Sequence, residues 1–349
     1  MSQGVGVRPP RLVVVLAALL ALVTACGSAE PVPLERAAAP STTETTSAVP
    51  TTAPAPTTTA GPPPPAPPPS PVLPPFPAGA GGVLVTPTGV VAPLRGGGPG
   101  GWSITTPCGL AVTTGSGQPL GGAHVVLDPG HGGDERGAVG PNGLTEAELN
   151  LAVAREAARR LEAAGATVVL TRAGDYQVPL AVRAAIAEQL TPHAFVSIHH
   201  NAEPDGPREG PGSETYYQIA SADSKRLAGI LYEETVAALD RYDVAWVADT
   251  DAGAKYRLNS RGGDYYGILR MPAGGTSVLA ELAFLSNPAE AELLARPEVQ
   301  AVEAEAIVRG VLRFLTTDDP GSGFTEPYPR SSPAGPGGGD AGCADPPLD

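Results

Sequence analysis

The sequence is poor in positive charge and lacks two common catalytic motifs. Its 22 Lys and Arg residues stand against 36 Asp and Glu residues, so the 349-residue chain carries a net charge of −14 at pH 7. This balance argues against nucleic-acid binding, which needs a basic surface. The chain has no G-x-S-x-G stretch and no G-x-x-x-x-G-K-[ST] stretch. A serine hydrolase with a nucleophile elbow and a nucleotide-binding phosphate loop therefore both lack their central part.

Long apolar runs are also scarce. The one at the start of the chain, LVVVLAALLALV, follows Arg8 and Arg11 and precedes small residues. It is too short for a stable membrane span and is typical of a secretory signal peptide. The stretch VTAC, ending at Cys26, resembles a bacterial lipobox, in which the cysteine is lipidated. We predict an exported protein held by a lipid on Cys26 at the outer face of the cytoplasmic membrane. Ordinary cleavage near Ala25, giving a secreted protein, is the alternative.

Only three cysteines occur, and two of them flank the region of mixed strand and helix patterns. If Cys26 is lipidated, Cys108 and Cys343 remain in an oxidising compartment. Their placement before and after a domain predicts a disulfide that ties its ends together. Two free thiols, or a reactive nucleophile, are the alternative.

Glycine and proline, in contrast, are abundant, with 44 and 41 residues gathered toward both ends of the chain. From Ser28 to about Pro77 almost no large apolar residue is present, so this stretch cannot bury enough surface to offset the entropy of ordering. We divide the chain by composition in the following way: signal peptide with lipobox, 1–26; disordered linker, 27–100; N-terminal extension, 101–120; folded domain, 121–316; Gly/Pro-rich tail, 317–349.

Within 121–316, strand-like and helix-like segments alternate. The strand HVVLDP precedes a helix beginning near Glu146, with Thr145 and Glu148 in a capping-box pattern and Gly165 as a C-terminal stop. Three further segments are predicted to be helices: PLAVRAAIAEQL, ADSKRLAGILYEETVAALD and PEVQAVEAEAIVRGVLRFL. Five are predicted to be strands: ATVVLTR, AFVSIHHNA, SETYYQ, YYGILR and TSVLAELAFL. This alternation predicts an α/β fold, a single domain whose mostly parallel sheet is covered by helices.

Four polar residues fall at places where such a sheet forms sites. His131 follows the first strand, Glu146 opens the next helix, His199 ends FVSIHH, and Glu281 lies in SVLAELAF. Sites in open α/β sheets form beyond the carboxyl ends of the strands. Two imidazoles and one carboxylate are a ligand set of hydrolytic zinc, which keeps a fourth position for water. A further carboxylate, Glu281, would then act as general base.

An ordered set of motifs resembles the zinc-dependent N-acetylmuramoyl-L-alanine amidases of the Amidase_3 type. The segments, over roughly 121–316, are VVLDPGHGG, GAVGPNGLTEAELNLAVA, TRAGD, FVSIHHNA, YYGILR and VLAELAFLSNP. The resemblance implies one Zn²⁺ held by His131, Glu146 and His199, with Glu281 as the catalytic carboxylate. It also implies hydrolysis of the amide between N-acetylmuramic acid and the L-alanine of the peptidoglycan stem peptide by zinc-activated water.

Each histidine also has an ordinary interpretation. His131 alone could be a turn residue with a backbone hydrogen bond. His199 and His200 are adjacent in a strand, so their side chains point to opposite faces, and the SIH match selects His199. At His200 relatives often have a small residue, and we expect it to face substrate or solvent. His124 and His193 are interpreted as structural.

The two glutamates have competing interpretations as well. Glu146 alone could be an acidic residue favoured by a helix N-terminus. An unpaired Glu281 inside a core would be costly, so it needs a cation or solvent. The main competitor to a catalytic role is a salt bridge from Arg172, Arg183 or Arg270.

Some positions depart from the family pattern, namely Ala147, Ala187 with Glu188, and Ala283. None removes a ligand or the base, and Ala283 could narrow the space beside Glu281. Two rival functions stay open: a non-catalytic cell-wall binding or activator lipoprotein on the same fold, and a zinc peptidase cutting within the stem peptide. We expect a monomer and an ordinary surface loop at 247–264, with gating of the cleft as the alternative.

Overall fold

The structure is a computed structural model that describes residues 71–75, 81–98, 100–270, 275–327 and 342–349. These residues belong to the second of the two units into which the chain divides, residues 66–349. The predicted signal peptide, the lipobox at Cys26 and most of the predicted linker lie outside the described residues. No described helix is long and apolar enough to cross a membrane.

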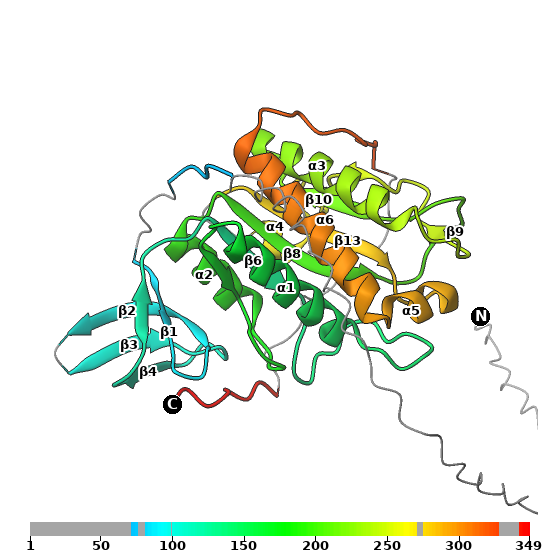
Figure 1. The fold of residues 1–349 in the computed structure, drawn as a ribbon. Coiled ribbons are helices and arrows are strands. Elements are labelled where there is room, and N and C mark those ends of the chain that lie inside the picture. The colour runs from blue at the N-terminus through cyan, green and yellow to red at the C-terminus, as the bar shows by residue number, and fades with distance from the viewer. Residues whose placement is uncertain (1–70, 76–80, 99, 271–274, 328–341) are drawn as a thin grey trace, which may run out of the picture. The chain divides into compact units, whose positions relative to one another are not determined.

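A six-stranded sheet forms the centre of the fold, in the order β12-β10-β13-β8-β6-β7 (Figure 1). Its strands are β6 (Val125–Pro129), β7 (Val168–Leu170), β8 (Ala194–Asn201), β10 (Glu214–Tyr217), β12 (Ala254–Lys255) and β13 (Ser277–Phe284). All neighbouring pairs are parallel except β10 with β13. The prediction of a mostly parallel α/β sheet is confirmed. A separate two-stranded ribbon pairs β9 (Gly206–Pro207) with β11 (Val247–Ala248).

Helices cover both faces of this sheet. One face carries α1 (Glu146–Ala163), α3 (Ala222–Leu239), α5 (Pro288–Leu294) and α6 (Pro297–Thr316), and the other carries α2 (Leu180–Leu190) and the short α4 (Gly267–Arg270). In Figure 1, α1, α6 and α3 cross the sheet side by side, and α6 packs between the other two.

Alternation along the strands decides which side chains reach which layer. Val196 and Ile198 of β8 join the core under α1, α3 and α6, whereas Phe195 packs with the residues of α2. Since successive side chains of a strand point to opposite faces, His199 lies on the α2 side and His200 on the α1 side. The expected separation of the two histidines is confirmed.

Helix α1 begins and ends where its sequence predicts. The Thr145 hydroxyl accepts a hydrogen bond from the Glu148 N–H, and the Glu148 carboxylate accepts one from the Thr145 N–H. The helix ends at Ala163, and Gly165 follows with φ of 93°, a conformation that suits glycine. The cap fixes Glu146 as the first helical residue.

A second, five-stranded antiparallel sheet precedes the large one, in the order β4-β3-β2-β1-β5. Its strands are β1 (Val83–Val85), β2 (Val91–Gly98), β3 (Gly101–Thr105), β4 (Ala111–Thr114) and β5 (Gln118–Leu120). Val83 and Val91 pack with Val182, Ile186 and Leu190 of α2. The boundary predicted for a disordered linker, 27–100, is thus wrong for 83–98, because α2 supplies the apolar partner that this segment lacks by itself.

The predicted tail, 317–349, also contacts the folded part in its two described pieces. Phe324 forms a parallel β-bridge with Ala254 of β12, and Leu348 packs against the five-stranded sheet. A disulfide joins Cys108 to Cys343, as the sequence predicts.

One segment has a different structure from the predicted one. YYGILR was expected to form a strand, but its last four residues are the helix α4. Ile268 and Leu269 are adjacent and both buried. A helical turn allows neighbouring side chains to pack into one layer, whereas a strand would point them to opposite faces.

Candidate metal centre

The turn after β6 brings His131 to the edge of the sheet, where the neighbouring side chains are closely packed. His131 itself has φ of 60°, in the left-handed region. A Cβ atom on Gly130 would lie 2.2 Å from the His199 ring, and one on Gly137 would lie 2.4 Å from Glu146 Oε2. These two positions must therefore be glycine for the three polar side chains to meet.

The three predicted ligands converge. His131 Nε2 lies 3.1 Å from Glu146 Oε2, and His199 Nδ1 lies 2.8 Å from Glu146 Oε1. One ligand atom from each of the three residues lies within 4.8 Å of the others. The imidazole centroids are 5.0 Å apart, with the rings nearly perpendicular. A loop, a helix start and a strand end thus contribute one donor each, as the sequence predicts.

Further groups orient these donors. Glu135 Oε1 lies 3.1 Å from His131 Nδ1, the nitrogen that points away from Glu146. The Ala138 N–H donates to Glu146 Oε2 at 2.9 Å. A carboxylate behind a histidine is the usual partner of a metal-binding imidazole, since it fixes the ring's orientation. Glu135 was not among the predicted site residues; its place four residues after His131 in a glycine-rich turn was the available signal.

The charges around the three donors suit a cation. Burial alone would lower the pKa of His131, but hydrogen bonds to Glu135 and Glu146 outweigh it and raise this pKa to about 10. Burial lowers the pKa of His199, which favours the neutral ring that a metal ligand needs. A proton on His131 thus balances Glu146 in this arrangement, and a divalent cation among the same donors would take its place.

Glu281 lies beside this cluster on β13. Its backbone pairs with His199 of β8 on one side and with Glu214 of β10 on the other. Glu281 Oε2 is buried and has no hydrogen-bond partner among the described residues. Desolvation, and then the negative charge of Glu146, raise the pKa of Glu281 well above its ordinary value. A buried carboxylate oxygen without a partner calls for a cation or a reacting group nearby.

The arginines that could have paired with Glu281 make other contacts. Arg172 donates to the carbonyls of Pro129, Gly130, Ala147 and Gly174. Arg270 donates to the carbonyls of Asp264 and Tyr265. No ion pair between an arginine and Glu281 occurs in the described part of the chain. The competing salt-bridge interpretation is therefore wrong for the described arginines.

Arg183 stabilises the turn that carries His131. It pairs with Asp128 at 2.6 Å, with both side chains buried, and donates to the His131 carbonyl at 2.7 Å. The hydroxyls of Thr171 and Ser197 also donate to the Asp128 carboxylate. Desolvation acts to raise the pKa of Asp128, but Arg183 and the hydroxyls outweigh it and leave this pKa below its ordinary value. The charged pair therefore fixes the backbone that carries His131.

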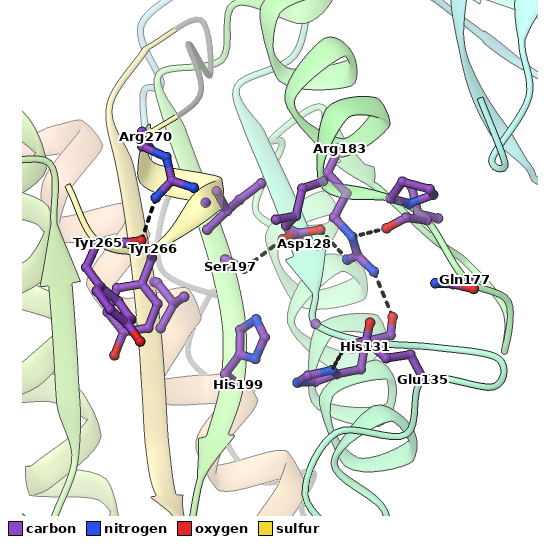
Figure 2. A pocket seen from close by; sticks show the side chains of 17 residues that line it. Asp128, His131, Glu135, Gln177, Arg183, Ser197, His199, Tyr265, Tyr266 and Arg270 are labelled. Atoms are coloured by element: carbon purple, nitrogen blue, oxygen red, sulfur yellow. Dashed lines mark hydrogen bonds and ion pairs between the residues drawn. The ribbon is translucent and has the colours of Figure 1, made fainter. Parts of the chain in front are cut away.

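A cavity of about 280 Å³ opens next to the two histidines. In Figure 2, His199 lies between His131 and the pair Tyr265 and Tyr266. Arg270 lines the same cavity. A space with an apolar and aromatic wall and a few polar groups is the usual form of a small-molecule or polymer-binding site. The segment 247–264 ends beside this wall, and gating of the cavity by this segment stays a prediction.

A second acidic group, Glu214, Asp249 and Asp251, has carboxylate oxygens within 4.8 Å of one another. Lys255 Nζ lies 2.8 Å from Glu214 Oε1 and 2.5 Å from Asp251 Oδ1. The ammonium group already supplies the positive charge there, so this group is a buried ion network.

The remaining histidines lie away from the cavity. His200 is buried, with 1% exposure, so the expectation that it faces substrate or solvent is wrong. The parity of β8 turns it into the layer under α1 and α6. His124 accepts a hydrogen bond from the Thr167 N–H, and His193 Nε2 lies 3.0 Å from the Pro75 carbonyl oxygen.

The sequence of this chain matches a known protein family. Residues 125–313, more than half of the chain, match the sequence profile of the N-acetylmuramoyl-L-alanine amidases, Amidase_3. YqiI of Bacillus subtilis, an uncharacterised protein, is 36% identical over 218 residues, which cover 60% of this chain and 95% of YqiI. The germination-specific N-acetylmuramoyl-L-alanine amidase of the same organism is 31% identical over 213 residues, covering 57% and 82% respectively.

Other relatives are longer proteins. AmiC of Neisseria meningitidis, an N-acetylmuramoyl-L-alanine amidase, is 32% identical, and the match spans 55% of this chain and 53% of AmiC. Among solved structures, the amidase AmiC2 of Nostoc punctiforme is 32% identical with a TM-score of 0.47, over 55% of this chain and 97% of that one. The profile match over residues 125–313 places this chain in the N-acetylmuramoyl-L-alanine amidase family.

Proposed function

We propose that this protein is an exported peptidoglycan amidase that cleaves the bond between N-acetylmuramic acid and the L-alanine of the stem peptide. The observation that carries the proposal is the convergence of His131, Glu146 and His199 beside the unpartnered Glu281 Oε2. Family membership supports the amidase chemistry. Family relatives named as cell-wall amidases support the substrate class.

The donor set fits one zinc ion. Two imidazole nitrogens and one carboxylate, with a carboxylate behind one imidazole, match the composition of hydrolytic zinc sites. Zinc held by His131, Glu146 and His199 would supply a Lewis acid for the carbonyl and a water of lowered pKa. The imidazoles bind as neutral rings, a state that the pKa shift of His199 already favours.

Glu281 carries the proton in this proposal. Its carboxylate takes a proton from the attacking water and returns it to the departing amine of L-alanine. Desolvation and the charge of Glu146 raise the pKa of Glu281, and a bound cation would lower it again, toward the range where it can both accept and donate a proton. The cavity beside His131 and His199 then holds the muramoyl-peptide, with Tyr265 and Tyr266 forming one wall.

The location of the protein is part of the same proposal. A lipid on Cys26 would anchor the chain, and the Pro/Thr/Ala-rich segment after it would let the enzymatic domain reach the cell wall as a monomer. The Cys108–Cys343 disulfide of the structure is consistent with an oxidising compartment outside the cytoplasm.

The test is digestion of purified muropeptides by the chain from residue 27 onward, with zinc content measured on the same sample. This chain retains β1 and β2 of the small sheet. Glu281→Gln is the matched variant, since it keeps the side-chain shape and removes the base. We expect free peptides beginning with L-alanine from the wild type. In the variant we expect a rate lower by about 10²–10⁴-fold with zinc retained.

The other outcomes identify the rival functions. Zinc binding without cleavage by the wild type would indicate a cell-wall binding or activator protein. Shortened stem peptides still attached to the glycan would indicate a peptidase that cuts within the stem. Cleavage that survives in Glu281→Gln would remove Glu281 from the catalytic role.

A further inference from the structure

A buried chain of polar side chains leads from Glu146 to helix α6 on the far side of the sheet from the cavity. We propose that Asn150, His200 and Glu303 are positioning residues that hold the Glu146 carboxylate in its metal-binding orientation, so that α6 sets the metal affinity. The inference rests on the proposed metal centre and names three residues that none of the sequence motifs assigned to it.

The chain of contacts begins at the ligand. Asn150 Nδ2 donates to Glu146 Oε1 and to the Gly130 carbonyl, each at 3.3 Å. The His200 N–H donates to the same Glu146 oxygen at 3.2 Å. On the other oxygen, the Ala138 N–H donates at 2.9 Å. Both carboxylate oxygens are therefore held by donors from outside the ligand set, which fixes the plane of the carboxylate.

The direction of the hydrogen bonds along the chain follows from these contacts. Because both neighbours of Asn150 Nδ2 are acceptors, its other atom, Oδ1, must face His200. His200 Nδ1 lies 2.8 Å from that oxygen and so must donate to it. His200 Nε2 lies 3.3 Å from Glu303 Oε1, which closes the chain at α6. The orientation of Asn150 thus depends on the imidazole, and the imidazole depends on Glu303.

The surroundings argue against a role in stability alone. The side chains of His200 and Glu303 are both 0% exposed, and their layer is otherwise formed by residues such as Leu149, Val153 and Ile307. Burying such a pair in place of apolar side chains gives little or no net stability. Glu303 Oε2 has no partner among the described residues, a further cost. A polar chain that ends on Glu146 has a purpose at the ligand that a close-packed apolar layer would not serve.

The experiment measures zinc affinity, by competition with a chromophoric chelator, on the metal-free full chain and its variants. His200→Ala interrupts the chain beside Asn150. Glu303→Leu removes the hydrogen-bonding partner of His200 Nε2 at α6, and Glu303→Gln keeps a hydrogen-bonding group there. Thr215→Val is the matched control, because the Thr215 hydroxyl donates to the Ala228 carbonyl in the same buried layer without contacting Glu146.

We expect zinc affinity to fall by about 10–100-fold in His200→Ala. Glu303→Leu should also bind zinc more weakly than Glu303→Gln, which should stay within about threefold of the wild type. The absorption spectrum of the Co²⁺-loaded protein should change in the variants that weaken zinc. Thr215→Val should lower the melting temperature of the metal-free protein and leave the affinity and the spectrum unchanged.

Wild-type affinity and an unaltered Co²⁺ spectrum in His200→Ala would overturn the inference, as would equal affinities of Glu303→Leu and Glu303→Gln. If His200→Ala does not fold, the Glu303 pair decides alone. A wild type that binds zinc but releases no peptide would refute the proposed amidase and leave this test intact. A wild type that binds no zinc would refute both.

Discussion

The six-stranded sheet is covered on both faces, whereas the five-stranded sheet has a core of its own of only three fully buried residues, Leu84, Ala92 and Ile104. The large sheet and the start of α1 beside it hold buried charges, including Asp128, Glu214 and Glu146. The buried polar residues of the small sheet and its turns are the uncharged Thr86, Thr106 and Thr114. Extensive apolar packing lets the large sheet retain charged groups near the cavity, and the small sheet relies on α2 and a disulfide.

This comparison predicts the largest loss of stability from an unpaired charge in the large sheet. Arg183→Met would leave the Asp128 carboxylate buried without its cation, at about 3–5 kcal/mol of unfolding free energy. Urea unfolding of the metal-free protein at pH 7 measures it. The control is Arg159→Ala, which removes an exposed ion pair with Glu156 and should cost far less, because solvent screens that pair. Similar losses in the two variants would contradict the stated difference between buried and exposed pairs.

The small sheet should respond most to loss of its covalent link. Replacing Cys108 and Cys343 together by serine removes a cross-link between residues 235 positions apart. The expected cost is about 2–4 kcal/mol. It should appear in amide hydrogen exchange as faster exchange in β2, β3 and β4, with β6 and β8 unchanged. Equal acceleration in both sheets would show that the disulfide stabilises the whole domain.

The sequence predicts the large sheet and its site because their signals are local. Thr145 and Glu148 identify the start of α1, and hence Glu146, within four residues. The glycine turn after β6 locates His131 in the same way. The parity of β8 separates His199 from His200, and the SIH match selects His199. The position of each of these residues on its own turn, helix or strand follows from the local sequence. Their convergence in space depends on the fold.

The features that the sequence did not predict depend on distant partners. Strand β2 ends in RGGG, which is poor in apolar residues, and its start is buried against α2. Arg183 reaches Asp128 across 55 positions, and His200 reaches Glu303 across 103. A strand's parity shows that His200 leaves the site face, but only the packing of α6 shows what it meets there.

A change of pH should also affect the stability of the large sheet and not that of the small sheet. The buried Glu290 carboxylate accepts hydrogen bonds from the Phe284 and Val247 N–H groups, yet desolvation outweighs these and raises its pKa to about 7. The folded state therefore binds this proton more tightly than the unfolded state, in which the pKa is about 4.5. The resulting stability is fully present below about pH 4.5 and is lost as pH rises through about 7.

Between those limits the wild type should lose about 2–3 kcal/mol relative to Glu290→Gln, which does not titrate. Unfolding free energies of both proteins, metal-free, at pH 4.5, 6 and 8 measure the difference. Exchange rates in the small sheet, corrected for the intrinsic effect of pH, should stay the same. A constant difference between the two proteins across this range would show that Glu290 does not titrate there.

The smallest effect concerns the cap that starts α1. Thr145→Ala removes the side-chain acceptor for the Glu148 N–H, at about 1 kcal/mol of unfolding free energy. Thr145→Ser keeps that acceptor and should recover most of the loss. Because Glu146 is held by Ala138, Asn150 and His200 as well, zinc affinity should change by less than about threefold in Thr145→Ala. A larger drop in affinity would mean that the cap, rather than the buried contacts, orients the ligand.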